Sequence, residues 1–116
     1  MLHKKHRLAK TSDVQKALGR GRAFFNPLFS LRFLSHSLQK RFTVVVSTKV
    51  SKKAVRRNRV KRLLREFIRL QINNFSFGDY VVMVKPAAGK LEDKGLLFSF
   101  EEFIFKTKLL KNEEDL

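Results

Sequence analysis

Between Lys49 and Arg69 the chain holds ten Lys or Arg residues and a single acid, Glu66. Apolar residues in this segment follow the i, i+3, i+4, i+7 spacing of a helix that packs one side on a core. They are Val60, Leu63, Leu64 and Phe67. The segment is therefore predicted to be a helix that belongs to a folded core and carries more positive charge than a solvated face needs.

The positive charge is not spread evenly over the chain. Residues 1–65 carry 19 Lys or Arg and one acid, a net charge of +18, whereas residues 66–116 carry seven basic and nine acidic residues, a net charge of −2. Like charges one helical turn apart, as at Lys61 and Arg65, cost about 0.2–0.5 kcal/mol. Arg also outnumbers Lys between residues 56 and 69, which suits bidentate phosphate contacts. The basic half is therefore predicted to bind a polyanion, nucleic acid rather than a membrane surface, and the C-terminal half to be scaffold.

Composition predicts one domain over residues 1–116, with an ordered core of about 5–110. Hydrophobic residues make up 43% of the chain and include twelve Phe, and there is no Cys. The scattered His3, His6 and His36 do not predict a metal site. No run reaches the ~18 apolar residues of a membrane span, and no apolar stretch of secretory type follows the N-terminal charges. We therefore expect no membrane association and a cytoplasmic location.

The expected secondary structure alternates short strands with helices. The sequence predicts a helix over 14–18, a short strand over 23–25, strands over 28–34 and 41–49, a helix over 56–72, a strand over 80–84 and a helix over 92–110. The order α-β-β-β-α-β-α predicts an α+β fold, a small α/β sandwich with helices packed on one mixed sheet. The strands over 28–34 and 41–49 are joined by a short polar link, so we expect them to pair antiparallel. The consecutive Val44, Val45 and Val46 predict a strand covered on both faces.

No constellation of catalytic residues is recognisable. Asp13 and Glu66 are the carboxylates in or beside the basic half, and Glu66 follows Arg62 by four residues, which predicts a helix ion pair. No phosphate-binding glycine loop, nucleophile elbow or metal-spaced cluster is present. We therefore expect no active site in the protein itself.

Aromatic and apolar residues near the second strand allow two interpretations. They are Phe25, Phe29, Leu31 and Phe33. They form part of the core, or they form a stacking platform for single-stranded nucleic acid on the sheet face that the helices leave open. Basic residues could form the rim of such a platform: Arg20, Arg22, Arg32, Lys40 and Arg41.

The run Arg57-Asn58-Arg59-Val60-Lys61-Arg62-Leu63-Leu64-Arg65-Glu66 resembles the signature of the bacterial ribonuclease P protein subunit. Three other stretches are similar to landmarks of that family, and they occur in the same order. They are Arg7-Leu8, Val45 to Val55 and Asp79 to Pro86. The resemblance covers roughly residues 5–110.

The resemblance implies a function. Proteins of this family join a catalytic RNA that removes the 5′ leader of precursor tRNA, so the chain would be the accessory subunit of an endoribonuclease. The RNA hydrolyses the substrate with bound Mg²⁺, which the RNA mainly holds, and the protein alone binds none. The protein binds the catalytic RNA and the leader. The family fold also implies a left-handed β-α-β crossover, although right-handed crossovers make up about 98% of cases.

The resemblance also implies two groups of site residues. Those that would contact the RNA subunit are Lys49, Lys52, Lys53, Arg56, Arg57, Asn58, Arg59, Lys61, Arg62 and Arg65, with Arg57 and Arg59 expected to make the most direct contacts. Those that would line a leader-binding cleft between the first helix and the sheet are Val14, Leu18, Phe25, Phe29, Leu31 and Phe33. Val14 and Leu18 stand where the family commonly has aromatic residues, and Ser51 stands where it often has Gly.

Other interpretations remain open at this point. A general structured-RNA-binding protein of ribosomal type would have the same charge but no leader cleft. A standalone nuclease and a membrane-surface protein are the remaining candidates. The sequence leaves open the oligomeric state of the free protein, its leader preference and the architecture of its RNA partner.

Overall fold

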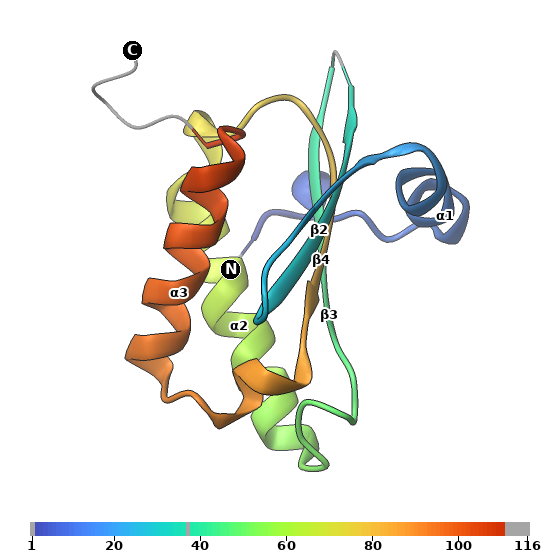
Figure 1. Ribbon diagram of the computed structural model, residues 1–116. Coiled ribbons are helices and arrows are strands. Elements are labelled where there is room, and N and C mark those ends of the chain that lie inside the picture. Colours follow the sequence, from blue (N-terminus) through green and yellow to red (C-terminus); the bar gives the residue numbers. More distant parts are fainter. Residues whose placement is uncertain (1, 37, 111–116) are drawn as a thin grey trace.

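The computed structural model describes residues 2–36 and 38–110 and contains one mixed sheet with helices on both faces (Figure 1). The strands are β1 (Arg22–Phe25), β2 (Phe29–Ser35), β3 (Lys40–Val46) and β4 (Gly78–Val84), in the spatial order β1-β2-β4-β3. The α-helices are α1 (Thr11–Arg20), α2 (Ala54–Leu70) and α3 (Asp93–Thr107). Short 3-10 helices are η1 (Lys4–His6), η2 (Ile72–Asn74) and η3 (Pro86–Lys90). The α+β class and the element order predicted from the sequence are confirmed.

The predicted pairing of the second and third strands is wrong. β4 lies between them, antiparallel to β2 and parallel to β3, so that Val82 is paired with Leu31 on one side and with Val44 on the other. β4 takes the centre because almost all its residues are buried, and a strand buried on both faces needs neighbours on both edges. β3 is consequently an edge strand, and Val45 is 43% exposed, so the expectation that Val44 to Val46 are covered on both faces is also wrong. The parallel pair β3 and β4 is joined through α2, and the left hand of this crossover stays a prediction from the resemblance.

The main core lies between the sheet and the pair α2 and α3. Alternate residues of β2 point into it: Phe29 and Leu31 have no exposed surface and Phe33 is 7% exposed. The Phe29 ring centroid lies 5.2 Å from that of Phe100 and 5.8 Å from that of Phe103, both on α3. Full burial of each such side chain stabilises the fold by about 1.5–3 kcal/mol. These residues are therefore structural.

The other face of the sheet is covered in part, by α1. A small separate cluster centred on Leu8, Ala17 and Val81 attaches this helix. Arg41 adds a polar link, because its guanidinium bonds Asp79 on β4 and Asp13 on α1. The remaining surface of this face stays open to solvent.

Glycine at position 21 explains how α1 can end so close to the sheet. A Cβ there would collide with the carbonyl oxygen of Ala17 and lie 3.0 Å from that of Phe33. Gly19 lies inside α1, and the helix is longer at both ends than the predicted 14–18. In the part of the chain that the structure describes, no helix has the length and apolar character needed to cross a membrane.

Candidate nucleic-acid interface

Helix α2 is amphipathic in the way its sequence predicts. Val60, Leu64 and Ile68 are buried against the core. Asn58, Arg62 and Arg65 are exposed on the opposite side. The loop before the helix adds the exposed Lys49, Lys52 and Lys53 at its N-terminal end. These exposed residues form a basic surface along α2 and the loop before it.

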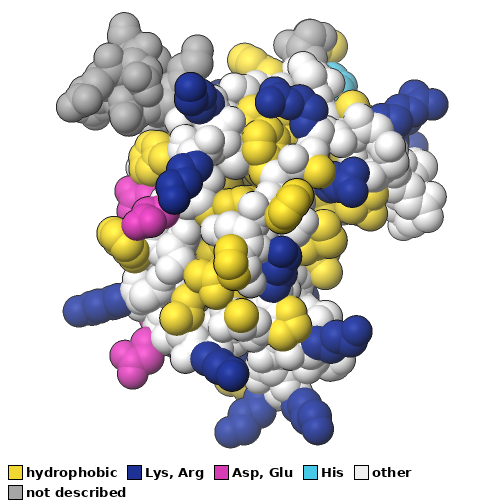
Figure 2. Space-filling model, viewed as in Figure 1, with side chains coloured by type: hydrophobic (Ala, Val, Ile, Leu, Met, Phe, Trp, Pro, Cys, Tyr) yellow, Lys and Arg dark blue, Asp and Glu magenta, His cyan; other side chains and the backbone are white. Residues whose placement is uncertain are grey.

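The charge separation predicted from the sequence is visible on the molecular surface. Figure 2 shows the acidic side chains on the side formed by α3, while Lys and Arg side chains are scattered over the face among hydrophobic side chains, and several gather at the end where α2 begins. Helix α3 thus carries several of the acids, among them Asp93, Glu101 and Glu102.

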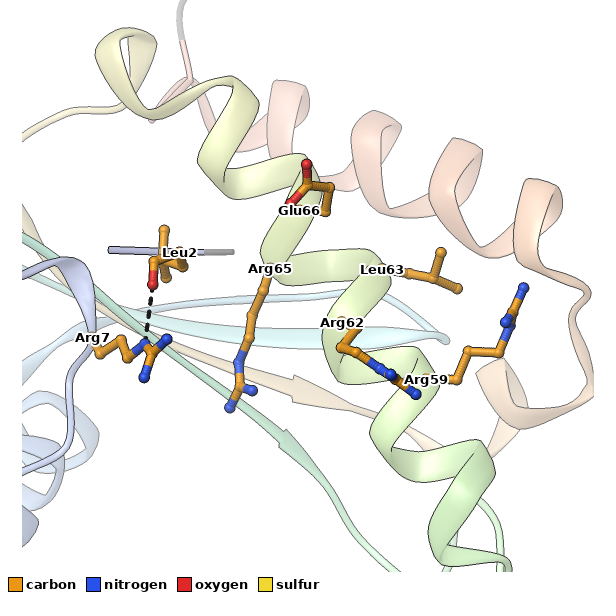
Figure 3. Close-up of a pocket in the computed structure, with 7 residues that line it drawn as sticks. All are labelled: Leu2, Arg7, Arg59, Arg62, Leu63, Arg65 and Glu66. Carbon is orange, nitrogen blue, oxygen red and sulfur yellow. Dashed lines mark hydrogen bonds between the residues drawn. The ribbon is translucent and has the colours of Figure 1, made fainter. Parts of the chain in front are cut away.

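A hollow of about 680 Å³ lies between the N-terminal segment and α2 (Figure 3). Its lining residues are Leu2, Arg7, Arg59, Arg62, Leu63, Arg65 and Glu66. Leu2 is 2% exposed and anchors the segment on the core, and Arg7 Nε donates to the Leu2 carbonyl oxygen at 3.1 Å. Because four of the lining residues are Arg, we call this space the arginine hollow.

The acid at the arginine hollow belongs to an ion pair within α2. Arg69 donates to Glu66, and this hydrogen bond lowers the pKa of Glu66 to about 2. The sequence predicted Arg62 as the partner of Glu66, and this is wrong: the pair forms at i, i+3 with Arg69. Arg62 is therefore left to point into the hollow.

Two of the predicted RNA-binding arginines are held by α3. Arg56 Nη1 lies 2.8 Å from Asp93 Oδ1, and Arg59 donates from Nε and Nη2 to Asp93 Oδ2 at 2.7 and 2.5 Å. These bonds lower the pKa of Asp93, with Arg59 the larger cause, and raise the pKa of Arg59. Arg57 Nη1 donates to the Ser51 carbonyl oxygen at 2.9 Å. Arg57 and Arg59 therefore have intramolecular partners, and the expectation that they make the most direct RNA contacts stays a prediction.

Cations without an acidic partner lie further along the helix. Among the described residues, Lys61, Arg62 and Arg65 form no salt bridge. Arg7 was not among the predicted site residues: Arg7-Leu8 was matched to a family landmark, but nothing in the sequence places it beside α2. It joins the surface because the N-terminal segment runs beside β3, where Arg7 forms a bridge with Phe42, and lines the same hollow as α2. Arg7, Arg62 and Arg65 are the groups best placed to meet phosphates.

Three predicted members of the leader cleft lie elsewhere. Phe29, Leu31 and Phe33 face α2 and α3 and are buried in the main core, so the prediction that they line a cleft beside α1 is wrong. The physical reason is the alternation of a strand, which sends these three side chains to the face opposite α1. The core interpretation of these residues is the one that the structure supports.

Other predicted members do lie on the α1 side. Val14 is half-buried, and Leu18 is 37% exposed. Phe25 is 74% exposed, and it shares this face because it pairs with Ser30. Lys85 Nζ lies 5.4 Å from the Phe25 ring centroid and donates to the Asn26 carbonyl oxygen at 2.6 Å, which fixes the strand end beside the ring.

Two further residues of the open face, Ser30 and Met83, were missed, whereas Arg32 was predicted as a rim residue. Ser30, Arg32 and Met83 are half-buried there, and Arg32 Nη1 donates to the Leu18 carbonyl oxygen at 3.2 Å. Their signal was present in the sequence, because they occupy the alternate positions of strands whose other face is apolar. The signal was not used, because the apolar face of the strand was interpreted as the cleft.

A second hollow of about 330 Å³ connects the two regions at the β3 edge. Its lining residues are Arg7, Leu8, Ala9, Thr11, Val14, Phe42, Thr43 and Arg65. Arg7 and Arg65 line both this hollow and the arginine hollow. The basic side of α2 is therefore continuous with the α1 face of the sheet.

Metal ligands are not grouped in the part of the chain that the structure describes. Across residues 2–36 and 38–110, no group of three or more His, Cys, Asp or Glu could hold a metal ion. The chemistry of the interface as described is that of guanidinium, ammonium and aromatic groups.

Comparison with known proteins decides the family. The family model described as Ribonuclease P matches residues 2–108. The chain belongs to the ribonuclease P protein family. The ribonuclease P protein component of Bacillus velezensis is 34% identical over 113 residues, which cover 95% of this chain and 96% of the relative. That of Chromobacterium violaceum is 40% identical over 86 residues, which cover 71% and 69%.

Solved structures agree with the family. A Staphylococcus aureus RNase P protein matches with a TM-score of 0.86 at 24% identity, over 93% of this chain and all of that one. A Thermotoga maritima RNase P protein in complex with 1-(4-fluorophenyl)-2-thiourea matches with a TM-score of 0.74 at 26% identity, over 92% and 100%. This chain therefore has the fold of the ribonuclease P protein family.

Proposed function

We propose that this member of the ribonuclease P family is the protein subunit of that endoribonuclease. It binds the catalytic RNA through α2 and takes part in removal of the 5′ leader of precursor tRNA. The observation that carries the proposal is the convergence of Arg7, Arg62 and Arg65 beside the family's Arg-Asn-Arg run, without carboxylate partners among the described residues. Phosphates would supply the missing negative charge.

The division of labour follows from the side chains at the interface. The catalytic RNA carries out hydrolysis with Mg²⁺ that it mainly holds itself. This chain neutralises phosphates by displacing their counterions, which brings RNA strands close together. Its guanidinium groups can also bind phosphates with two parallel hydrogen bonds, which sets orientation as well as affinity.

The leader is proposed to lie on the α1 face of the sheet. Val14, Leu18 and Phe25 supply apolar contact there, and Arg32 supplies charge. A leader bound on this face reaches the basic side of α2 past Arg65, which lines both hollows. Precursor tRNA as a substrate also favours the cytoplasmic location expected from the sequence.

The decisive test adds the protein to protein-free ribonuclease P RNA at low Mg²⁺ and measures cleavage of precursor tRNA. We expect cleavage at the mature 5′ end to be stimulated. The absence of stimulation would refute the proposal, and cleavage by the protein without RNA would indicate a standalone nuclease. Equal affinity for unrelated structured RNAs would favour a general RNA-binding protein of ribosomal type.

A further inference from the structure

A separate hollow of about 470 Å³ lies near the C-terminal end of α2. Its lining residues are Lys5, His6, Leu38, Gln39, Lys40, Ile72, Asn73 and Phe77. None of them belongs to the predicted RNA-subunit residues or to the leader cleft. The volume lies within the about 300–1,000 Å³ range of small-ligand pockets.

Lys40 and Phe77 form the structured part of this hollow. Lys40 Nζ donates to the carbonyl oxygens of Ile72 and Asn73 at 3.0 and 3.4 Å and lies 4.7 Å from the Phe77 ring centroid. Burial lowers the pKa of Lys40. The ammonium group is therefore fixed by the backbone at the end of α2, and it holds the ring through a cation–π contact.

The ring and the neighbouring Leu38 are open to solvent, among lining residues that are mostly polar or charged. Phe77 is 52% exposed and Leu38 is 79% exposed. His6 Nδ1 lies 2.8 Å from the Lys40 carbonyl oxygen and donates to it, because that oxygen can only accept. This bond holds η1, with the exposed Lys5, beside the ring.

We propose that this hollow binds an unpaired nucleotide of the RNA subunit, with its base stacked on Phe77 and its phosphate near Lys5. Aromatic rings next to cations are the usual platform for single-stranded nucleic acid. Charge complementarity supports the assignment, because the lining contains two Lys and one His and no carboxylate. Phe98 on α3 differs in this respect. It is 63% exposed, but the exposed Glu101 and Glu102 lie one turn further along the helix, and their negative charge disfavours a phosphate.

The position of the hollow favours the RNA subunit over the leader as the source of the nucleotide. The N-terminal segment contributes Leu2 and Arg7 to the arginine hollow, and it contributes Lys5 and His6 to this one. One RNA could therefore follow α2 along its about 25 Å length and contact both hollows. No residue of α1 lines this hollow, so it is separate from the leader face. This inference rests on the proposed function.

The first experiment probes the site without the catalytic RNA. The full-length protein is cross-linked by ultraviolet light to a short unstructured oligouridylate, and the modified peptides are mapped by mass spectrometry. We expect a cross-link at Phe77, and we expect its loss in Phe77→Leu, which keeps an apolar side chain but removes the ring. Cross-links on α1, α2 and the sheet with none at Phe77 would overturn the proposal whether or not the protein is a ribonuclease P subunit.

The second experiment tests the source of the nucleotide. Affinity for the catalytic RNA is compared among wild type, Phe77→Leu, Phe77→Tyr and the matched control Phe98→Leu. We expect about fivefold weaker binding for Phe77→Leu, which is the lower end of base stacking, and no change for Phe77→Tyr or Phe98→Leu. Equal affinity of all four proteins for the catalytic RNA would refute the site. The proposed function would still stand if the wild-type protein stimulates cleavage. A loss confined to leader-bearing substrate would refute the RNA subunit as the source.

Discussion

Asp93, at the start of α3, accepts hydrogen bonds from Arg59 Nε and Nη2 at 2.7 and 2.5 Å through a single carboxylate oxygen. Its other oxygen accepts from Arg56 at 2.8 Å. The scaffold helix therefore orients two arginines of the basic helix α2. Asp93, like Asp79 with Arg41, links the acidic half of the chain to the basic half.

The first prediction concerns the pH dependence of this link. The pKa of Asp93 is lowered in the folded state, so its contribution to stability is present above its ordinary value of 3.8 and is lost as pH falls through the folded pKa. We expect Asp93→Asn to reduce the melting temperature at pH 7 and to make stability depend less on pH below about 4. Thermal unfolding followed by circular dichroism from pH 7 to 2.5 measures both. Glu101→Gln, on the exposed side of the same helix, should leave the curve as in wild type.

The second prediction ranks the basic residues of α2. Arg62→Ala with Arg65→Ala should reduce affinity for the catalytic RNA and lower the slope of log K against log salt by about 0.7–0.9 for each phosphate that the variant no longer neutralises. Arg57→Ala with Arg59→Ala should reduce the slope less, because both residues already have intramolecular partners. Fluorescence anisotropy over a salt series measures these slopes. If the second pair had the larger effect, the ranking from ion pairing would be wrong.

The third prediction separates the two faces of the sheet. Phe25→Ala should weaken binding of leader-bearing precursor tRNA and leave binding of mature tRNA unchanged, because Phe25 is exposed on the α1 face. Phe29→Ala should instead destabilise the fold by about 3–5 kcal/mol, because it leaves a cavity in the core. Urea unfolding and substrate affinity, measured on both variants, distinguish the roles. A leader-specific defect in a stably folded Phe29→Ala protein would contradict this assignment.

The fourth prediction concerns the attachment of α1. Arg41 donates to both oxygens of Asp79, which is 4% exposed, and to Asp13 on α1. Arg41→Met should cost about 3 kcal/mol of unfolding free energy, because it leaves Asp79 buried and without its cation. Asp13→Asn removes a more exposed pair and should cost less than about 1 kcal/mol. Chemical denaturation measures both changes, and similar costs would mean that Asp79 gains little from Arg41.

Much of the site was predictable because it lies on one helix. The periodicity of Val60 and Leu64 places the exposed arginines of α2 without any knowledge of their neighbours. Phe29 shows the opposite situation: alternation predicts that it shares a face with Leu31 and Phe33, but not which face. That depends on which side of the sheet α2 and α3 occupy.

Strand order shows the same limit. β2 and β3 are linked by only a few residues, which favours pairing between neighbours in sequence. β4 lies between them because its side chains are buried on both faces and its backbone needs partners at both edges. Local sequence indicates how apolar a strand is. Which strands pair with it depends on the whole chain.

The sequence by itself therefore determined the class of fold, the basic helix and, through its Arg-Asn-Arg run, the family, because these depend on spacing along one element. Only the tertiary structure decided which cations are available. Asp93 on α3 holds Arg56 and Arg59, whereas Arg7 joins Arg62 and Arg65 from the far end of the chain. Ion pairs between residues more than thirty positions apart leave no periodic signal, so charge counting could not separate bound arginines from available ones.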